Sequence, residues 1–334
     1  MYRFSKAINN ISKFYLGDEV VIYQKNDGNL LLNDLILGNF IQQIEITVFN
    51  NIYINDWDGN FSIYNNKGNL VEKGIDQAFY YVSKYYVGKQ YIENNSIYES
   101  LIDKNNQLVF RVGFEKFNSE NTLSKNNYFL LNKNRDIVCF NLKNEKENWI
   151  FHISQMSQQE TEAYKILGVF ENDLLVILDD SSILRIDIET GEIKKRFNMI
   201  LFSNTENEII AQYNFIQFID DKLIYYRCGQ YAEYDIELNK ITYEFDIKEA
   251  LEKEKLNDNT HSYIKEDDFL YFYISGFGSF SLPSIVILNI RTKEIVWKHI
   301  LDNPDVFYKD FQKSDTALYL LDSANTLHIF EKNE

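Results

Sequence analysis

Residues 268–298 read DFLYFYISGFGSFSLPSIVILNIRTKEIVWK, and this stretch decides the fold. It contains three runs of aromatic and β-branched residues, at 269–274, 284–290 and 294–298. A loop rich in Gly and Ser separates the first two runs, and a short polar turn separates the last two. Aromatic and β-branched side chains suit the half-buried surface of a sheet, so the stretch predicts three antiparallel strands.

The same pattern recurs in the C-terminal half of the chain, in residues 173–193, 221–241 and 316–330. The spacing is nearly constant, because one leucine holds the same place in each copy (223 − 175 = 48, 270 − 223 = 47, 318 − 270 = 48), namely Leu175, Leu223, Leu270 and Leu318. A period of about 45 residues with three or four strands in each unit is typical of a β-propeller. A single blade cannot bury both of its faces, and stacking against neighbouring blades explains the density of apolar residues.

Weaker copies occupy the N-terminal half of the chain, at residues 19–32, 51–72, 78–111 and 127–151. We therefore expect one all-β domain over residues 1–334, a β-propeller of seven or eight four-stranded blades, and the spacing of the better copies favours seven. The last copy ends at Phe330 without an outer strand. Residues 2–8 are expected to supply that strand, so that N- and C-terminal strands close the ring.

The composition describes an acidic globular chain. Apolar residues make up 45% of the 334 residues, and the net charge is −16 with a pI of about 4.8. A field of this sign repels nucleic acid phosphates and anionic membrane surfaces, so we expect neither as a partner. It favours a basic protein partner, or simply provides solubility.

Several features favour a cytoplasmic location. The first residues lack the apolar core of a signal peptide, and no run is long enough to span a bilayer. Cys139 and Cys228 lie in separate copies of the repeat and are expected to be buried thiols in a reducing compartment.

The turn Asp187-Ile188-Glu189-Thr190-Gly191 and the strand ending at Trp297 resemble the repeat of pyrroloquinoline-quinone-type (PQQ-like) propellers. That repeat ends a strand with Asp, continues with a Thr-Gly turn and closes with Trp. No single copy here carries all of these residues. The resemblance implies the propeller fold over residues 173–330 and a Trp297 packed between blades. It does not extend to the quinoprotein active site, so no cofactor is expected.

Three aromatic residues are candidates for contact with a partner. Trp57 lies in the turn Asp56-Trp57-Asp58-Gly59-Asn60, which begins like a calcium loop but lacks its later ligands, so a hairpin turn is the better interpretation. Phe277 and Phe280 lie in an inserted loop at 275–283 and either cover a blade or contact a partner.

The sequence contains no recognisable catalytic or metal-binding motif. His152, His261, His299 and His328 have no metal-ligand spacing, and we expect neither catalytic residues nor a metal site. A second insertion, residues 246–256, has the pattern of a short helix that connects two blades.

These features favour a non-catalytic protein-binding propeller, and more specifically an immunity-type inhibitor that neutralises a basic toxin such as a nuclease. One alternative is an enzyme, a hydrolase or lyase, with carboxylates in the central channel. Another is an assembly scaffold, which predicts self-association or several partners. The fold alone does not choose among the three.

Overall fold

A computed structural model describes residues 1–17, 20–32, 35–39, 44–46, 51–56, 60–75, 77–83, 86–94, 96–103, 107–113, 117–124, 126–132, 134–144, 146–156, 161–202, 207–256, 260–274, 282–301, 303 and 305–333. The chain forms two compact units. One comprises Met1–Phe40, Ile224–Glu233 and Thr242–Glu334, and the other comprises Ile41–Leu223 and Tyr234–Ile241.

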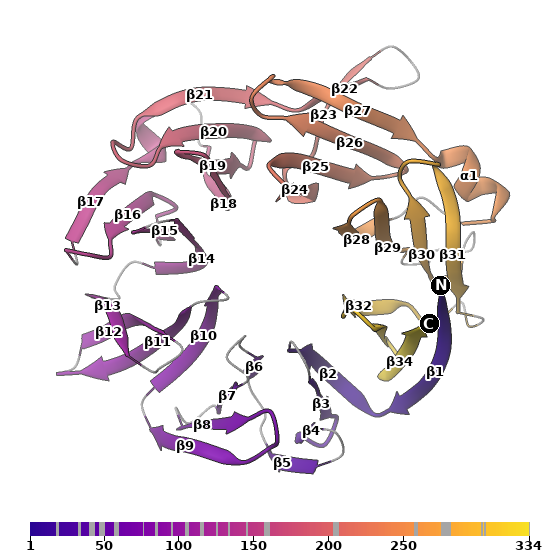
Figure 1. Ribbon diagram of the computed structural model, residues 1–334, viewed down its shortest axis with the longest axis horizontal. Coiled ribbons are helices and arrows are strands. Elements are labelled where there is room, and N and C mark those ends of the chain that lie inside the picture. The colour runs from indigo at the N-terminus through magenta and orange to yellow at the C-terminus, as the bar shows by residue number, and fades with distance from the viewer. Residues whose placement is uncertain are drawn as a thin grey trace. The chain divides into compact units, whose positions relative to one another are not determined.

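The fold is an all-β propeller with eight four-stranded antiparallel blades (Figure 1). The first unit contains three whole blades, with strands β2 Ile11–Leu16, β3 Val21–Lys25, β4 Asn29–Leu32 and β5 Leu35–Asn39; β28 Thr260–Glu266, β29 Phe269–Ile274, β30 Ser284–Asn289 and β31 Glu294–Ile300; and β32 Tyr308–Lys313, β33 Ala317–Asp322, β34 Thr326–Lys332 and β1 Tyr2–Asn9.

The second unit contains four whole blades, with strands β6 Ile44–Ile46, β7 Asn51–Asn55, β8 Asn60–Asn65 and β9 Leu70–Ile75; β10 Gln77–Ser83, β11 Tyr86–Glu93, β12 Ser96–Ile102 and β13 Leu108–Gly113; β14 Phe117–Ser124, β15 Asn127–Asn132, β16 Ile137–Asn141 and β17 Lys146–Phe151; and β18 Ala163–Phe170, β19 Asp173–Leu178, β20 Ser182–Asp187 and β21 Ile193–Asn198. The remaining blade contributes to both units, with β24 Ile216–Ile219, β25 Lys222–Arg227, β26 Gln230–Asp235 and β27 Lys240–Asp246.

The preference for seven blades was wrong, and the reason lies in the connections. The first strands of the N-terminal blades begin at Ile11, Ile44 and Gln77, which are 33 residues apart (44 − 11 and 77 − 44). The period of about 48 residues in the C-terminal half includes insertions between blades and within hairpins. The weak N-terminal copies are therefore complete blades with short turns.

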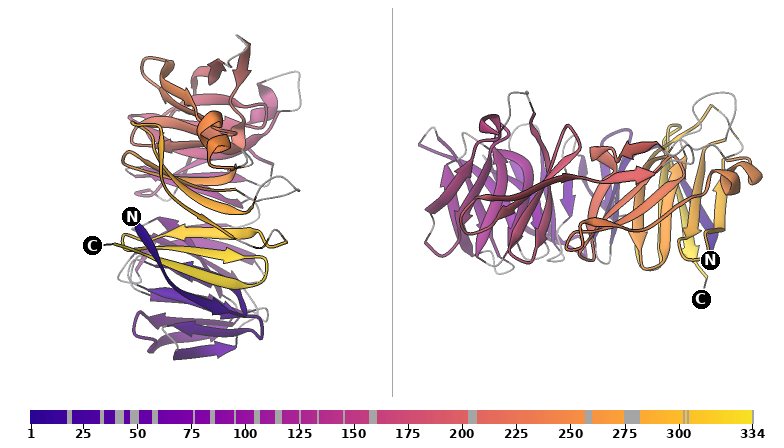
Figure 2. Two further views of the ribbon diagram at one scale, coloured as in Figure 1. Left: turned by 90° about the vertical axis from the view of Figure 1, so that its right-hand side faces the viewer. Right: turned by 90° about the horizontal axis from the view of Figure 1, so that it is seen from above.

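The predicted closure of the last blade is confirmed. β1 pairs antiparallel with β34, from Tyr2 opposite Lys332 to Asn9 opposite Thr326. β1 is thus the outer strand of the blade whose other strands end the chain. Figure 1 and both views of Figure 2 show the N- and C-termini side by side at this blade.

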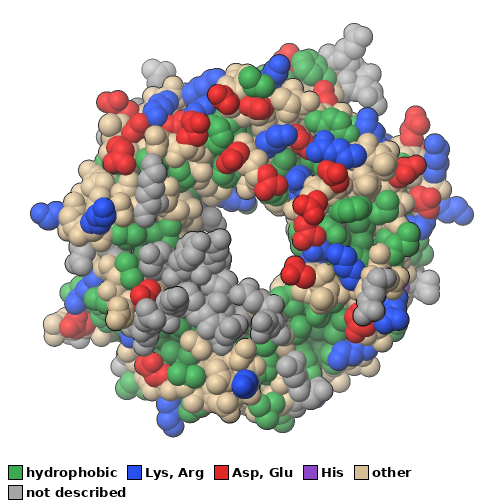
Figure 3. Space-filling model, in the orientation of Figure 1, with side chains coloured by type: hydrophobic (Ala, Val, Ile, Leu, Met, Phe, Trp, Pro, Cys, Tyr) green, Lys and Arg blue, Asp and Glu red, His purple; other side chains and the backbone are tan. Residues whose placement is uncertain are grey.

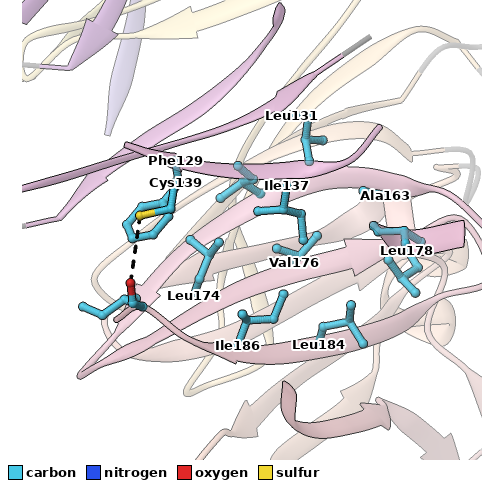
Figure 4. Packing of buried hydrophobic residues seen from close by; sticks show 13 residues of the cluster. Phe129, Leu131, Ile137, Cys139, Ala163, Leu174, Val176, Leu178, Leu184 and Ile186 are labelled. Atoms are coloured by element: carbon cyan, nitrogen blue, oxygen red, sulfur yellow. Dashed lines mark hydrogen bonds between the residues drawn. The ribbon is translucent and has the colours of Figure 1, made fainter. Parts of the chain in front are cut away.

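The core lies between blades, where inward-facing side chains of adjacent sheets meet. In the second unit, thirteen buried residues join the β14–β17 and β18–β21 blades (Figure 4), namely Phe129, Leu131, Ile137, Cys139, Ile153, Ala163, Ile166, Leu174, Val176, Leu178, Leu184, Ile186 and Ile188. Cys139 is a buried free thiol, as expected, and burial raises its pKa to about 12. Cys228 is also a free thiol but is only half-buried, contrary to expectation.

The turn between the third and fourth strands is stabilised in the same way in five blades of the described part of the chain. A side-chain oxygen at the end of the third strand accepts backbone N–H groups two or three residues later, and the residues concerned are Asn65, Asn141, Asp187, Asp235 and Asn289. Gly191 has a φ of +74° in this turn, and a Cβ there would lie 2.7 Å from the Trp149 ring. The Asp-x-x-Thr-Gly pattern therefore serves the turn and the packing of the neighbouring blade.

A second repeated feature joins one blade to the next. In each case a side-chain N–H or O–H donates to a main-chain carbonyl of the neighbouring blade. Three of these carbonyls belong to the residue that directly follows Asp187, Asp235 or Asn289, and the fourth belongs to Tyr2. The four bonds are Trp149 Nε1 to Ile188 O (3.1 Å), Arg185 Nη1 to Ile236 O (3.2 Å), Tyr243 Oη to Ile290 O (2.7 Å) and Trp297 Nε1 to Tyr2 O (2.9 Å). We call these the inter-blade bonds. The expected position of Trp297 between blades is confirmed.

The short helix predicted in residues 246–256 is α1, Lys248–Lys253. Asp246 Oδ1 accepts the backbone N–H of Lys248, and Ile247 and Leu251 are buried. The helix therefore connects β27 with β28 and packs its apolar side on the first unit.

Candidate functional site

The three aromatic residues predicted to contact a partner, Trp57, Phe277 and Phe280, lie outside the described residues. Their flanking strands are described. β7 and β8 form the hairpin that carries Trp57, and Asp56 Oδ1 accepts the N–H of Asn60 at 2.8 Å. The antiparallel pairing of β7 with β8 agrees with the hairpin interpretation of this segment. β29 and β30 likewise flank the loop that carries the two phenylalanines.

In both cases the described flanking strands are the second and third strands of a blade, which a turn joins. In an antiparallel blade, this turn lies at the same end as the connection that follows the fourth strand. We call it the connection end of the blade. Inserted segments at this end are α1 in one blade and, after the β18–β21 blade, an additional hairpin.

That additional hairpin consists of β22, Ile200–Phe202, and β23, Glu208–Ile210, and forms a sheet of its own. Figure 1 shows β22 continuing outward from the end of β21, away from the four strands of that blade. Met199, Leu201 and Ala211 are buried and anchor its base. The hairpin is therefore fixed at one end while its strands extend from the blade.

The outer part of the hairpin is apolar and exposed to solvent. The exposed fractions are 39% for Ile200, 60% for Phe202, 39% for Ile209 and 47% for Ile210. Ile200 and Ile210 are directly paired across the two strands, and Phe202 is two residues from Ile200, so these three side chains share a face. Contiguous apolar surface of this kind usually marks an interaction site.

Contacts with the blade position the hairpin base. The backbone N–H of Ala211 donates to Met199 O at 2.9 Å, and the N–H of Tyr213 donates to Ser181 Oγ at 3.2 Å, in the β19–β20 turn. The Tyr213 ring packs edge-on against Tyr164, with centroids 4.5 Å apart. Tyr164 is exposed, and tyrosine is frequent where proteins bind one another. We define the hairpin surface as the shared face of Ile200, Phe202 and Ile210 together with Tyr164 and Tyr213 near the hairpin base; Ile209 lies on the opposite face, with Leu201.

Carboxylates border the hairpin surface. Glu208 is exposed on β23, and Glu162, Asp179 and Asp180 are exposed at the connection end of the same blade. Burial raises the pKa of Asp180, but hydrogen bonds from Ser182 and the ion pair with Arg196 outweigh it and lower that pKa below its usual value. Asp180 is therefore ionised at neutral pH and paired with Arg196, and Arg135 Nη1 donates to Tyr164 O at 3.2 Å. Over the described residues, the border carries charges of both signs, with four carboxylates against two guanidinium groups, so its net charge is negative.

The acidic residues that recur in the repeat have different environments. Asp221 and Asp268 are exposed in turns between first and second strands, and Asp315 is exposed in the equivalent turn of the last blade. Asp173, at the start of the second strand of its blade, is instead buried and pairs with Arg185 and Lys194. Figure 3 shows acidic and basic side chains interspersed over the visible face.

The histidines are in ordinary structural environments. His152 Nδ1 lies 3.3 Å from Asp136 Oδ2, and His328 Nε2 lies 2.8 Å from Asp322 Oδ2. His299 packs on Phe330, and nothing is described of the His261 side chain. Within the described part of the chain, no group of three or more His, Cys, Asp or Glu could hold a metal ion.

One buried carboxylate has a strongly shifted pKa. Glu99 on β12 is 4% exposed, and Tyr128 Oη on β15 donates to its Oε1 at 3.0 Å. Burial raises the pKa of Glu99 to about 7, and the hydrogen bond from Tyr128 only partly opposes this shift. The carboxyl is enclosed between two blades of the second unit, so it contributes to stability rather than to an accessible site.

Glu99 makes stability depend on pH. Its pKa is about 7 in the folded protein against 4.5 for the free side chain, so the folded state binds the proton more tightly between these values. Stabilisation by the protonated carboxyl is complete below pH 4.5 and decreases by about 1.4 kcal/mol per pH unit as the pH rises toward 7. We expect Glu99→Gln, which remains neutral, to be more stable than the wild type at pH 8. Its free energy of unfolding should also lack the decrease with rising pH that the Glu99 carboxyl causes.

The measurement is the free energy of urea unfolding of both proteins from pH 5 to pH 8. Glu72→Gln, at an exposed position on β9, is the matched control for the loss of one negative charge. Parallel curves for the wild type and Glu99→Gln would contradict the prediction.

Sequence reasoning missed the β22–β23 hairpin. Residues 199–202 read MILF and residues 208–211 read EIIA, which resemble ordinary buried strands. The position of these two apolar runs was the one signal in the sequence. They lie between the fourth strand of one blade and the first strand of the next, where a propeller needs no further strands. The exposure of their side chains follows from packing and is not visible in the sequence.

Among the described residues, no helix is long and apolar enough to cross a membrane. No protein-family model matches the chain, and no curated protein matches its sequence.

Solved structures similar to this chain are β-propellers. The C-terminal WD40 domain of Sif2 has a TM-score of 0.62 and 9% identity over 100% of this chain and 99% of that one. Sqt1 from Saccharomyces cerevisiae has a TM-score of 0.61 and 11% identity, covering 100% and 98% of the two chains. BamB from Moraxella catarrhalis has a TM-score of 0.58 and 10% identity, with the same coverage. At these identities the similarity establishes the β-propeller fold.

Proposed function

We propose that this protein is a non-catalytic protein-binding propeller and that its partner docks on the hairpin surface. The observation that carries the proposal is the apolar face of Ile200, Phe202 and Ile210, which extends from the blade and is 39–60% exposed. Such a face is costly to leave in water, and burial against a partner would gain about 25 cal/mol per Å². The tyrosine pair beside it adds rigid contact area.

The partner in this proposal is a basic protein. The net charge of −16 and the carboxylates that border the hairpin surface support it, because they attract positive charge and orient it during encounter. The more specific proposal is an immunity-type inhibitor that neutralises a basic toxin, such as a nuclease, in the cytoplasm.

The proposal also includes the domain organisation and the type of repeat. Residues 1–334 act as one domain, because the β24–β27 blade contributes strands to both compact units. The repeats are of the PQQ-like type, which is supported by the capped turn at Asp187 and the inter-blade bonds of Trp149 and Trp297.

The experiment is affinity capture of the tagged protein at low and moderate salt, followed by affinity measurement with the partner recovered. We expect one basic protein, such as a toxin encoded beside the gene, bound stoichiometrically and released as salt rises. Phe202→Thr with Ile210→Thr should weaken binding at least about tenfold, because threonine preserves strand propensity while removing the apolar contacts.

The matched control replaces two exposed apolar residues on an outer strand elsewhere. Leu70→Thr with Ile75→Thr on β9 makes the same kind of change at 49% and 65% exposed positions and should leave binding unchanged. Equal affinity of both variants and the wild type would refute the hairpin surface. Recovery of an acidic partner, or of further copies of the chain alone, would refute the basic-partner proposal and favour a scaffold.

A further inference from the structure

The backbone of the β22–β23 hairpin presents unpaired edges. In an antiparallel pair, hydrogen-bonded and non-hydrogen-bonded residue pairs alternate. Because Ala211 N–H donates to Met199 O, the pairs Met199–Ala211 and Leu201–Ile209 hold the hydrogen-bonded positions. The other two pairs, Ile200–Ile210 and Phe202–Glu208, therefore direct their N–H and C=O groups outward, away from the partner strand.

These edges carry only part of the protection that usually prevents pairing with another strand. Natural edge strands are protected by short length, by charged side chains (Lys above all), by Pro, by bulges or by a covering segment. β22 and β23 are short and Glu208 is negatively charged, but the two strands contain no Lys or Pro and their register is continuous over the described residues. Within the described part of the chain, the sheet contains these two strands alone.

The strand β23 is the less covered of the two. On the face that packs on the blade, Leu201 of β22 is 2% exposed, whereas Ile209, its cross-strand partner on β23, is 39% exposed. An added strand therefore has more room beside β23. An added strand on β23 would receive hydrogen bonds from the outward N–H groups of Glu208 and Ile210 and donate to their carbonyls. Its alternate side chains would extend the apolar face formed by Ile210 and Ile200.

We propose that the partner binds by adding a β-strand to the outer edge of β23, and that the added segment is extended, apolar at alternate positions and lysine- or arginine-rich. This inference rests on the proposed function and specifies its mode of binding. Main-chain hydrogen bonds supply affinity in such strand addition, and alternate side chains supply specificity. The bordering carboxylates, Glu208 among them, select a basic segment. They also disfavour a second copy of this chain, whose net charge of −16 would repel it.

The test uses a short fluorescent peptide that alternates lysine and valine, titrated into the full-length protein and followed by anisotropy. We expect binding of this peptide and no binding of the version with glutamate in place of lysine. Methylating the backbone nitrogens of alternate residues removes the donors that face the hairpin. We expect the methylated peptide to bind at least about tenfold more weakly, because two or more main-chain hydrogen bonds are lost.

Proline variants identify the edge. Ile210→Pro removes an outward N–H of β23 and leaves the hairpin's internal hydrogen bonds intact, and proline is tolerated at such edge positions. Ile200→Pro makes the same change on the opposite edge and is the comparison variant. Because Ile200 also belongs to the hairpin surface, its loss removes one apolar contact but no N–H that the added strand uses. We therefore expect Ile210→Pro to weaken peptide binding at least about tenfold and Ile200→Pro to weaken it clearly less.

Several results would overturn strand addition: no binding of the lysine–valine peptide, equal binding of its methylated form, or equal effects of the two proline variants. If the captured partner still depends on Phe202 and Ile210 side chains in that case, the hairpin surface stands and strand addition alone fails. If the captured partner binds both sets of variants with the affinity of the wild type, the proposed surface fails as well. A wild-type dimer that Ile210→Pro converts to a monomer in sedimentation would identify a second copy as the occupant and refute the basic segment.

Discussion

Replacing Trp297 with alanine is expected to lower the free energy of unfolding by about 3 kcal/mol, at the low end for removing a large aromatic residue from a core. Trp297 on β31 is half-buried, and its ring centroid lies 5.9 Å from that of Tyr2 and 5.5 Å from that of Phe330. Tyr2 belongs to β1 and Phe330 to β34. The substitution therefore removes contacts with both strands that join the chain ends.

Trp297→Phe distinguishes the contribution of the ring contacts from that of the indole hydrogen bond. Phenylalanine retains much of the aromatic contact but leaves the Tyr2 carbonyl without the indole donor, which lies at 2.9 Å. We expect a loss of about 1 kcal/mol for this variant. Urea unfolding followed by circular dichroism gives both values, provided that the m-value stays constant.

Trp149 provides the matched control, because it makes the same inter-blade bond, to Ile188 O, without involving the chain ends. Trp149→Phe should cost as much as Trp297→Phe if the bonds are equivalent. A Trp297→Ala protein within 1 kcal/mol of the wild type would show that this contact does not hold β1 and the last blade to their neighbour.

Much of the fold could be predicted from the sequence because several second strands of blades are buried on both faces. β19, DLLVIL, and β33, ALYLLD, are buried throughout and stand out as continuous apolar runs. First strands are less distinct. β32, YKDFQK, is half polar and carries no strong strand pattern. The blade number was misjudged because insertions set the spacing of the clearest copies, while weak copies hid complete blades.

The candidate site was less predictable, for a different reason. Exposure depends on whether another element covers a strand, and the run 199–202 has the composition of a core strand. Aromatic residues in turns gave the predictions Trp57, Phe277 and Phe280, which lie outside the described residues and remain predictions.

The second large effect is expected at Asp173. Arg185 Nε donates to Asp173 Oδ2 at 2.8 Å, and Lys194 Nζ lies 2.6 Å from Oδ1. The side chains of Asp173 and Arg185 are 4% and 17% exposed. Asp173→Asn leaves the buried guanidinium without its counter-charge, so we expect a loss of about 3 kcal/mol in the free energy of unfolding.

Asp268 offers a control with matched geometry. Arg291 Nε donates to Asp268 Oδ1 at the same distance, 2.8 Å, but the Arg291 and Asp268 side chains are 55% and 51% exposed. We expect Asp268→Asn to cost at most about 0.5 kcal/mol, because water screens the exposed pair. Equal losses for the two variants would contradict the argument that burial decides the difference.

A double variant tests whether the loss at Asp173 reflects a stranded charge or lost packing. Asp173→Leu with Arg185→Met removes both charges and fills similar volume with apolar groups. We expect it to recover most of the stability lost in Asp173→Asn, since a buried ion pair can often be replaced by apolar residues at little cost. Arg185 also donates to Ile236 O and lies over the Phe170 ring, at 5.5 Å from its centroid. Any deficit that remains in the double variant therefore measures the inter-blade bond of Arg185 and its stacking, separately from its charge.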